Sequence, residues 1–138
     1  MKLKCLLFIL TAVSLSACST TKPAHKKSSE ADPETMLVSY RVKPGKQAEF
    51  QAVLARAWQI FRSEHMVFAR PHALVQVNEE GGKIRFVEIF TWVSHAAPDN
   101  APADVKAIWA REQSLCEARD GHPGIEGDAV EPVEIKKS

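Results

Sequence analysis

The segment from Lys83 to Val93 limits the choice of fold most, because it has the pattern of a β-strand that is apolar on both faces. Its apolar side chains divide into two sets, Ile84, Phe86, Phe90 and Trp92 on one face and Val87, Ile89 and Val93 on the other. A strand with one face in water alternates between apolar and polar residues. We therefore expect both faces of its sheet to be covered.

Hydrophobic periodicity and turn residues predict five further elements around this strand. In chain order they are a strand over 35–42, a helix from 44 to about 64, a strand over 72–78, a helix from the 98–102 breaker to about 120, and an edge strand over 125–135. The order β-α-β-β-α-β is the ferredoxin-like arrangement of an α+β fold, with two helices on one face of a four-stranded antiparallel sheet. A second copy of the chain would bury the other face, so we expect a homodimer.

Residues 1–17 have the features of a secretory signal peptide. Lys2 and Lys4 precede an apolar run from Cys5 to Val13, and Leu15-Ser16-Ala17-Cys18 follows. A charged start, a short apolar stretch and small residues at the cleavage site define such signals, and this run is shorter than the ~20 residues that span a bilayer. The last four residues resemble the lipobox of bacterial lipoproteins. That resemblance implies cleavage before Cys18 and attachment of lipid, including palmitate, to this cysteine.

The same resemblance implies a location in the cell envelope. Ser19 follows the lipidated cysteine, which in enterobacterial lipoproteins favours the outer membrane, facing the periplasm. An inner-membrane or Gram-positive surface location stays open. Residues 18–34 lack large apolar side chains and are expected to form a flexible tether. Residues 35–135 then form the folded domain, and residues 136–138 form a short tail.

Composition excludes several other classes of protein. With 18 basic and 17 acidic residues, the chain has no basic surface stripe of the kind that binds nucleic acid. Cys5 leaves with the signal peptide and Cys18 carries lipid, so Cys116 is the one thiol that remains and no internal disulfide forms. Cys116 falls among apolar residues of the second predicted helix, which favours a core position over a nucleophile.

Three local patterns accompany the element order across residues 36–133. They are the Val42-Lys43-Pro44-Gly45 exit from the first strand, the strand from Phe86 to Trp92, and the helix over 105–119. Together they resemble the dimeric α+β-barrel group that includes antibiotic-biosynthesis-monooxygenase-like domains. Members enclose a small cavity between helices and sheet. Some use it for cofactor-free oxidation of quinol-like or polyketide substrates, and others bind or degrade haem. Fold alone does not transfer either function.

Glu88 is the first candidate catalytic residue, because it is the one acid within the apolar strand and a lone buried carboxylate is costly. It is either a cavity acid or base, or a structural partner of Arg41 on the neighbouring first strand. Glu112 interrupts the apolar stripe of the second helix and has the same two interpretations, although a long side chain at a helix flank can also reach solvent.

His72 is the second candidate base, at the start of its predicted strand. His95 and His122 lie in loops, and no spacing of histidines and cysteines forms a metal-ligand motif, so no metal or other cofactor is expected. The Asn-Trp-His set of haem-degrading relatives does not carry over, because Asn78 and Asn100 fall in the hairpin and in the helix breaker.

Four aromatic residues are candidate walls of a ligand pocket or, alternatively, plain core or dimer interface: Tyr40, Phe86, Phe90 and Trp92. The sequence therefore predicts an envelope lipoprotein whose domain binds a small apolar or aromatic ligand, in the manner of a cofactor-free monooxygenase. The alternatives are a non-catalytic interaction lipoprotein of the envelope and a haem- or metal-handling protein.

Overall fold

A computed structural model describes residues 29–133. Cys18, the expected signal peptide, most of the expected tether and the expected tail over 136–138 lie outside this range. Seven elements follow one another: β1 (Glu34–Val42), α1 (Gln47–Ser63), β2 (Val67–Asn78), the short 3₁₀ helix η1 (Glu80–Gly82), β3 (Ile84–Trp92), α2 (Ala103–Leu115) and β4 (Ile125–Ala129). Neither helix is long and apolar enough to cross a membrane, within the residues described.

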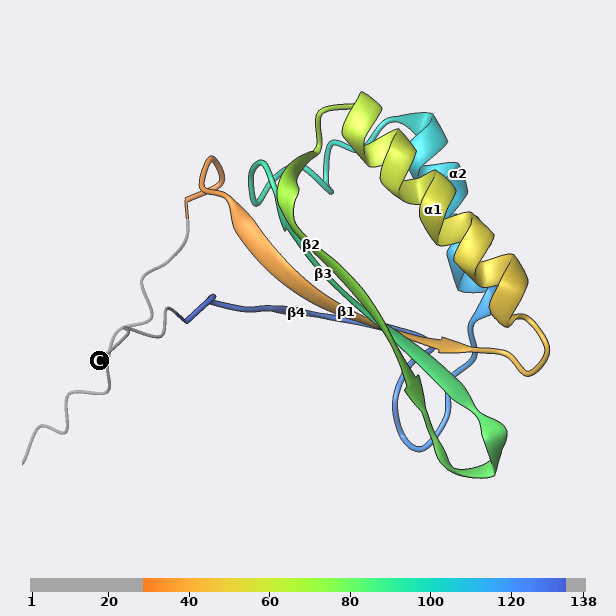
Figure 1. The fold of residues 1–138 in the computed structure, drawn as a ribbon. Helices are drawn as coiled ribbons and strands as arrows, with labels where there is room; N and C mark the ends of the chain where they lie inside the picture. Colours follow the sequence, from red (N-terminus) through yellow and green to blue (C-terminus); the bar gives the residue numbers. More distant parts are fainter. Residues whose placement is uncertain (1–28, 134–138) are drawn as a thin grey trace, which may run out of the picture.

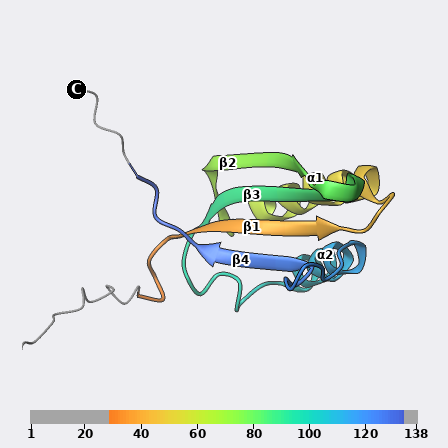
Figure 2. The ribbon, with the colours of Figure 1, turned by 90° about the horizontal axis from the view of Figure 1, so that it is seen from below.

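The four strands form one antiparallel sheet in the order β2-β3-β1-β4. Both helices pack on the same face of this sheet (Figure 1). Seen from below, the sheet lies in front of the helices, and its outer face carries no other described element (Figure 2). The structure thus confirms the ferredoxin-like β-α-β-β-α-β fold predicted from the sequence.

Apolar periodicity explains the packing of α1. Its buried residues, Phe50, Leu54, Ala57 and Phe61, recur at the spacing that puts side chains on one side of a helix. Gly45 adopts a φ of 74° in the turn between β1 and α1, a conformation that glycine reaches without steric cost. The chain therefore reverses direction there and lays α1 across the sheet.

Four predicted boundaries are wrong. α1 begins at Gln47 instead of 44, because Pro44 lies in the turn that precedes the helix. β2 begins at Val67 instead of 72, and it accommodates Pro71 beside an irregularity in its pairing with β3. This is compatible with an edge strand, where proline is tolerated. α2 ends at Leu115 instead of 120, because Cys116 turns to extended backbone and forms a bridge with Val42.

β4 also ends early, at Ala129 instead of 135. Ala129 pairs with Met36, close to the start of β1 at Glu34, so that β1 offers few further backbone partners beyond this point. Pro132 follows outside the strand, where its missing N–H breaks no ladder hydrogen bond.

The two faces of β3 have different neighbours. Phe90 and Trp92 face the helices and belong to a buried cluster with Phe61 and Val105, so the prediction that they lie at a dimer interface is wrong. On the opposite face of the sheet, strands β1, β2 and β3 contribute apolar side chains: Leu37, Ala73, Val75, Val87 and Ile89. The doubly apolar pattern therefore reflects one face covered by the helices and one face with an uncovered apolar patch, next to the charged Arg41 and Arg85.

Candidate active site

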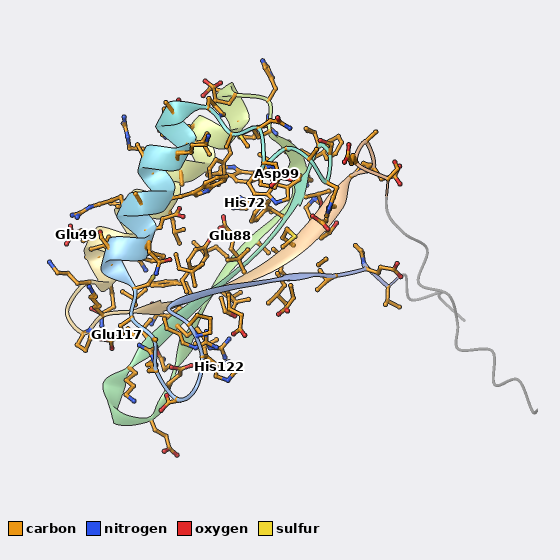
Figure 3. All side chains as sticks on the ribbon, turned by 180° about the vertical axis from the view of Figure 1, so that it is seen from behind. Glu49, His72, Glu88, Asp99, Glu117 and His122 are labelled. Atoms are coloured by element: carbon orange, nitrogen blue, oxygen red, sulfur yellow. The ribbon has the colours of Figure 1, made fainter. Side chains whose placement is uncertain are left out.

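Glu88, at the centre of β3, is buried and accepts hydrogen bonds at both oxygens. The Tyr40 hydroxyl donates to Oε2 at 2.9 Å, and Nε2 of His72 lies 2.9 Å from Oε1. Only 3% of Glu88 is exposed, whereas the side chain of His72 is 26% exposed. His72 and Glu88 lie in the layer between sheet and helices (Figure 3). The Tyr40–Glu88–His72 chain of hydrogen bonds therefore runs from the core towards solvent.

The register of the sheet brings these three side chains together. Tyr40 on β1 lies opposite Phe86, and His72 on β2 lies opposite Phe90. Side chains alternate between faces along a strand, so Tyr40, His72 and Glu88 all project towards the helices. Each partner is thus a diagonal neighbour of Glu88, within reach of a long side chain.

The alternative pairing of Glu88 with Arg41 is wrong. Arg41 lies opposite Arg85 on the sheet face away from the helices, and its guanidinium donates to Glu126 at 2.9 Å. β1 and β3 are neighbouring strands, as expected. Arg41 and Glu88 nevertheless project to opposite faces of the sheet, because side chains alternate between faces along each strand.

Stacking positions the His72 end of the hydrogen-bond chain, and burial keeps the Tyr40 end protonated. The imidazole of His72 stacks on Trp58 of α1, with ring centroids 3.5 Å apart and planes 7° from parallel. Burial raises the pKa of Tyr40 well above its ordinary value, and the nearby carboxyls of Glu88 and Glu112 raise it further. Tyr40 therefore keeps its proton and acts as the donor to Glu88.

A cavity of about 260 Å³, here called the α2 cavity, adjoins the Tyr40 end of the chain. Its lining is mainly aromatic and aliphatic: Val38, Tyr40, Phe61, Phe90, Trp92, Trp109, Glu112, Gln113 and Ile125. Such a pocket, with apolar walls and few polar groups, suits a small flat ligand.

A second cavity of about 320 Å³, the α1 cavity, adjoins the His72 end. It is lined by Gln51, Leu54, Ala55, Trp58, Gln59, His72, Leu74 and Glu88. The two cavities share no lining residue. The Tyr40–Glu88 hydrogen bond therefore joins a residue that lines one cavity to a residue that lines the other.

Glu112 does not reach solvent from the flank of α2, contrary to one expectation from the sequence. It lies on the buried side of the helix together with Val105, Ile108 and Leu115, and only 3% of it is exposed. Its Oε1 has no hydrogen-bond partner among the described residues. Burial, with a smaller contribution from the charge of Glu88, raises the pKa of Glu112 to about 8.

The six candidate residues are divided between the cavities and the core. Tyr40, Phe90 and Trp92 line the α2 cavity, and Glu88 and His72 line the α1 cavity. Phe86 lines neither, because it is buried in a separate cluster and stacks on Phe50 with ring centroids 5.6 Å apart. It belongs to the plain core that the sequence left as the alternative.

Trp58 and Trp109 are two site residues that the sequence does not reveal. Trp58 follows the apolar periodicity of α1, yet it stacks on His72 and lines the α1 cavity. Trp109 follows the apolar periodicity of α2, yet it lines the α2 cavity. Helical periodicity marks both as inward-facing, but it does not separate a cavity wall from filled core.

The remaining candidate groups form no site. His95 pairs with Glu34 at 2.9 Å and His122 pairs with Glu126 at 3.2 Å, both with exposed imidazoles. No three His, Cys, Asp or Glu side chains are grouped as metal ligands between residues 29 and 133. Burial raises the pKa of the Cys116 thiol to about 12, so a thiolate nucleophile is absent there at neutral pH.

Comparison with known proteins identifies the fold through structure alone, since no family model and no curated protein matches the sequence. A variant of SnoaB, a cofactor-independent oxygenase from Streptomyces nogalater, is 20% identical with a TM-score of 0.55, over 76% of this chain and 97% of that chain. A putative antibiotic biosynthesis monooxygenase from Caulobacter crescentus is 19% identical with a TM-score of 0.54, over 76% and 93%. The chain thus has the α+β fold of antibiotic-biosynthesis-monooxygenase-like proteins.

Proposed function

We propose that this protein is a cell-envelope lipoprotein whose domain binds a small hydroxylated aromatic compound in the α2 cavity and oxidises it with O₂, without a cofactor. The observation that carries the proposal is the Tyr40–Glu88–His72 chain, because its Tyr40 end lines an aromatic cavity and its His72 end approaches solvent. The structural likeness to a cofactor-independent oxygenase supports the same class of reaction.

Removal of a proton from the ligand is the first step. A phenolic hydroxyl in the α2 cavity donates to the Tyr40 oxygen, and Tyr40 passes its own hydrogen to Oε2 of Glu88. His72 at Oε1 stabilises the carboxyl and offers a route for the proton towards solvent. Tyr40 is the catalytic residue that touches the ligand, and Glu88 is the base that acts through it.

In the oxidation that follows, the ligand supplies all the electrons and O₂ accepts them. The phenolate is electron-rich and transfers an electron to O₂, and the resulting radical pair combines to form a C–O bond at a ring carbon that bears hydrogen. Loss of water from the peroxide leaves a carbonyl. For α-naphthol the sum is naphthol plus O₂ giving naphthoquinone plus H₂O, so O₂ takes four electrons from the ligand and no other reductant is consumed.

Lipid anchoring and dimerisation belong to the same proposal. The lipobox ending at Cys18 supports an anchor in the envelope membrane, with the outer membrane as the expected site. The uncovered apolar face around Val75, Val87 and Ile89 supports a homodimer, because monomeric proteins rarely expose such patches.

The test measures oxygen uptake and quinone formation when the purified protein is given α-naphthol. We expect both at equal rates, and we expect Glu88→Gln to lower them by roughly 10² to 10⁴ because a positioned base contributes about that factor. Glu126→Gln is the matched control, since Glu126 is a carboxylate on the opposite sheet face, paired with Arg41. Equal turnover in the two variants would remove Glu88 from the mechanism, and no turnover in any protein would favour the non-catalytic interaction lipoprotein.

A further inference from the structure

The α2 cavity contains one polar group that the proposed proton transfer does not use. Glu112 extends into it from α2, nearly fully buried, and its Oε1 finds no hydrogen-bond partner in the described chain. A buried polar atom without a partner costs on the order of 1–3 kcal/mol. Such an atom at the wall of a cavity is satisfied when a ligand brings the complementary group.

The surroundings of Glu112 determine which of its two protonation states faces the ligand. Tyr40 from β1, Glu88 from β3 and Cys116 at the end of α2 are the titratable groups that interact with it, and α1 contributes the apolar Phe61. None of the described residues that line the cavity is a cation. Glu112 is therefore mostly protonated at neutral pH, and its carboxyl is a hydrogen-bond donor.

We propose that Glu112 contacts the ligand and selects neutral aromatic compounds that carry a carbonyl oxygen, to which its protonated carboxyl donates a hydrogen bond. Quinones and hydroxyaryl ketones are such compounds, and the oxidation proposed above produces a carbonyl. The inference rests on the proposed aromatic ligand, and it adds that carboxylate ligands are rejected. A ligand carboxylate would enter a mainly apolar cavity with no cation among its described lining residues, so its charge would be buried without a partner.

The test compares two flat ligands of similar size, naphthoquinone with carbonyl oxygens and naphthalene with none. Their affinities are measured by calorimetry with the full chain carrying Cys18→Ser, which has no attached lipid. Three such proteins are compared: one with Glu112, one with Glu112→Leu and one with Glu112→Gln. Naphthalene is the internal control, because it reports whether the cavity of each variant is intact.

We expect the protein with Glu112 to prefer naphthoquinone. Glu112→Leu loses that preference, through a drop of roughly tenfold in naphthoquinone affinity with naphthalene binding retained. Glu112→Gln keeps an amide donor and so keeps the preference. Above pH 8 the affinity of the Glu112 protein for naphthoquinone falls as the carboxyl ionises, while that of Glu112→Gln stays level.

Two results would overturn the inference, and they are distinguishable. If both ligands bind and Glu112→Leu retains the preference for naphthoquinone, Glu112 is not the donor although the aromatic cavity stands. If neither ligand binds to any of the proteins, the proposed function fails together with the inference.

Discussion

The hydroxyl of Tyr40 donates to Oε2 of Glu88 at 2.9 Å, across the boundary between two cavities. Glu88 itself does not line the aromatic α2 cavity, whereas Tyr40 does. A base at Glu88 therefore reaches a ligand in that cavity through the tyrosine, and the two residues are expected to function as one unit.

A double-mutant cycle on this pair measures that dependence. Tyr40→Phe and Glu88→Gln each interrupt the same transfer, so we expect each to lower the rate of naphthol oxidation by a similar factor. The double variant should be about as slow as either single one, because residues that act as a unit are not additive. Factors that multiply in the double variant would show that Tyr40 and Glu88 act independently.

Tyr40→Phe has a cost in stability that helps to interpret the cycle. Oε2 of the buried Glu88 loses its donor, and a hydrogen bond to a charged group contributes about 1.5–3 kcal/mol. Glu88→Gln keeps an oxygen that accepts from Tyr40. We therefore expect urea denaturation to give a lower free energy of unfolding for Tyr40→Phe, and rates are compared at temperatures where both variants are folded.

Dimerisation is tested by two neighbouring residues that project to opposite faces of β2. Val75 is 54% exposed on the bare outer face, and Leu74 is 42% exposed on the face towards the helices. We expect Val75→Lys to convert a dimer to a folded monomer, since a charge would be buried at the interface. Leu74→Lys is the matched control and should remain a dimer. Analytical ultracentrifugation measures both, and a wild-type monomer at micromolar concentration would contradict the proposed homodimer.

The buried carboxyl of Glu112 predicts how stability depends on pH. Its pKa is about 8 in the folded protein against an ordinary value of 4.5, so the native state retains a proton that the unfolded state releases between these values. Stability from this group is complete below about pH 4.5 and is lost as pH rises to about 8. The limiting slope is about 1.4 kcal/mol per pH unit.

Glu112→Gln should remove that part of the pH dependence. Urea denaturation across this range is expected to show the wild type losing stability relative to Glu112→Gln as pH rises. Parallel curves for the two proteins would mean that Glu112 ionises alike in both states.

The sequence predicted the fold of this molecule more completely than its site. The order of the elements followed from periodicity, and the ferredoxin-like sheet followed from that order. The end of α2 did not, because the bridge between Cys116 and Val42 is a tertiary contact that helix periodicity does not contain. The choice between solvent and interior for Glu112 depended in the same way on how α2 packs on the sheet.

Within the site, the special position of Glu88 was visible as a single acid in an apolar strand, but its partners were not. Selecting Tyr40 over Arg41 required the parity of the register between β1 and β3. Separating Phe86 from Phe90 required the position of Phe50 on α1, because both phenylalanines lie on the same face of β3. Cavities arise where helices leave space above the sheet, and that space depends on three-dimensional packing.

The lipid anchor is tested separately from the domain. Cys18→Ser removes the residue that is proposed to carry the lipid, so we expect loss of labelled palmitate and release of the protein from the membrane fraction. Unchanged oxygen uptake by the released protein is the control for folding. Palmitate that stays on the Cys18→Ser protein would contradict the lipoprotein assignment.

The location of the ligand is the most direct test of the whole account, and the three tryptophans of the chain make it measurable. Trp92 and Trp109 line the α2 cavity and Trp58 lines the α1 cavity. In a Trp58→Phe protein, both tryptophans that remain line the α2 cavity, and excitation at 295 nm selects them over the tyrosine. We expect naphthoquinone to quench this fluorescence in a saturable manner, and to do so equally well in the wild type. Saturable quenching that disappears with Trp58→Phe, or no quenching in either protein, would contradict the assignment of the α2 cavity as the ligand site.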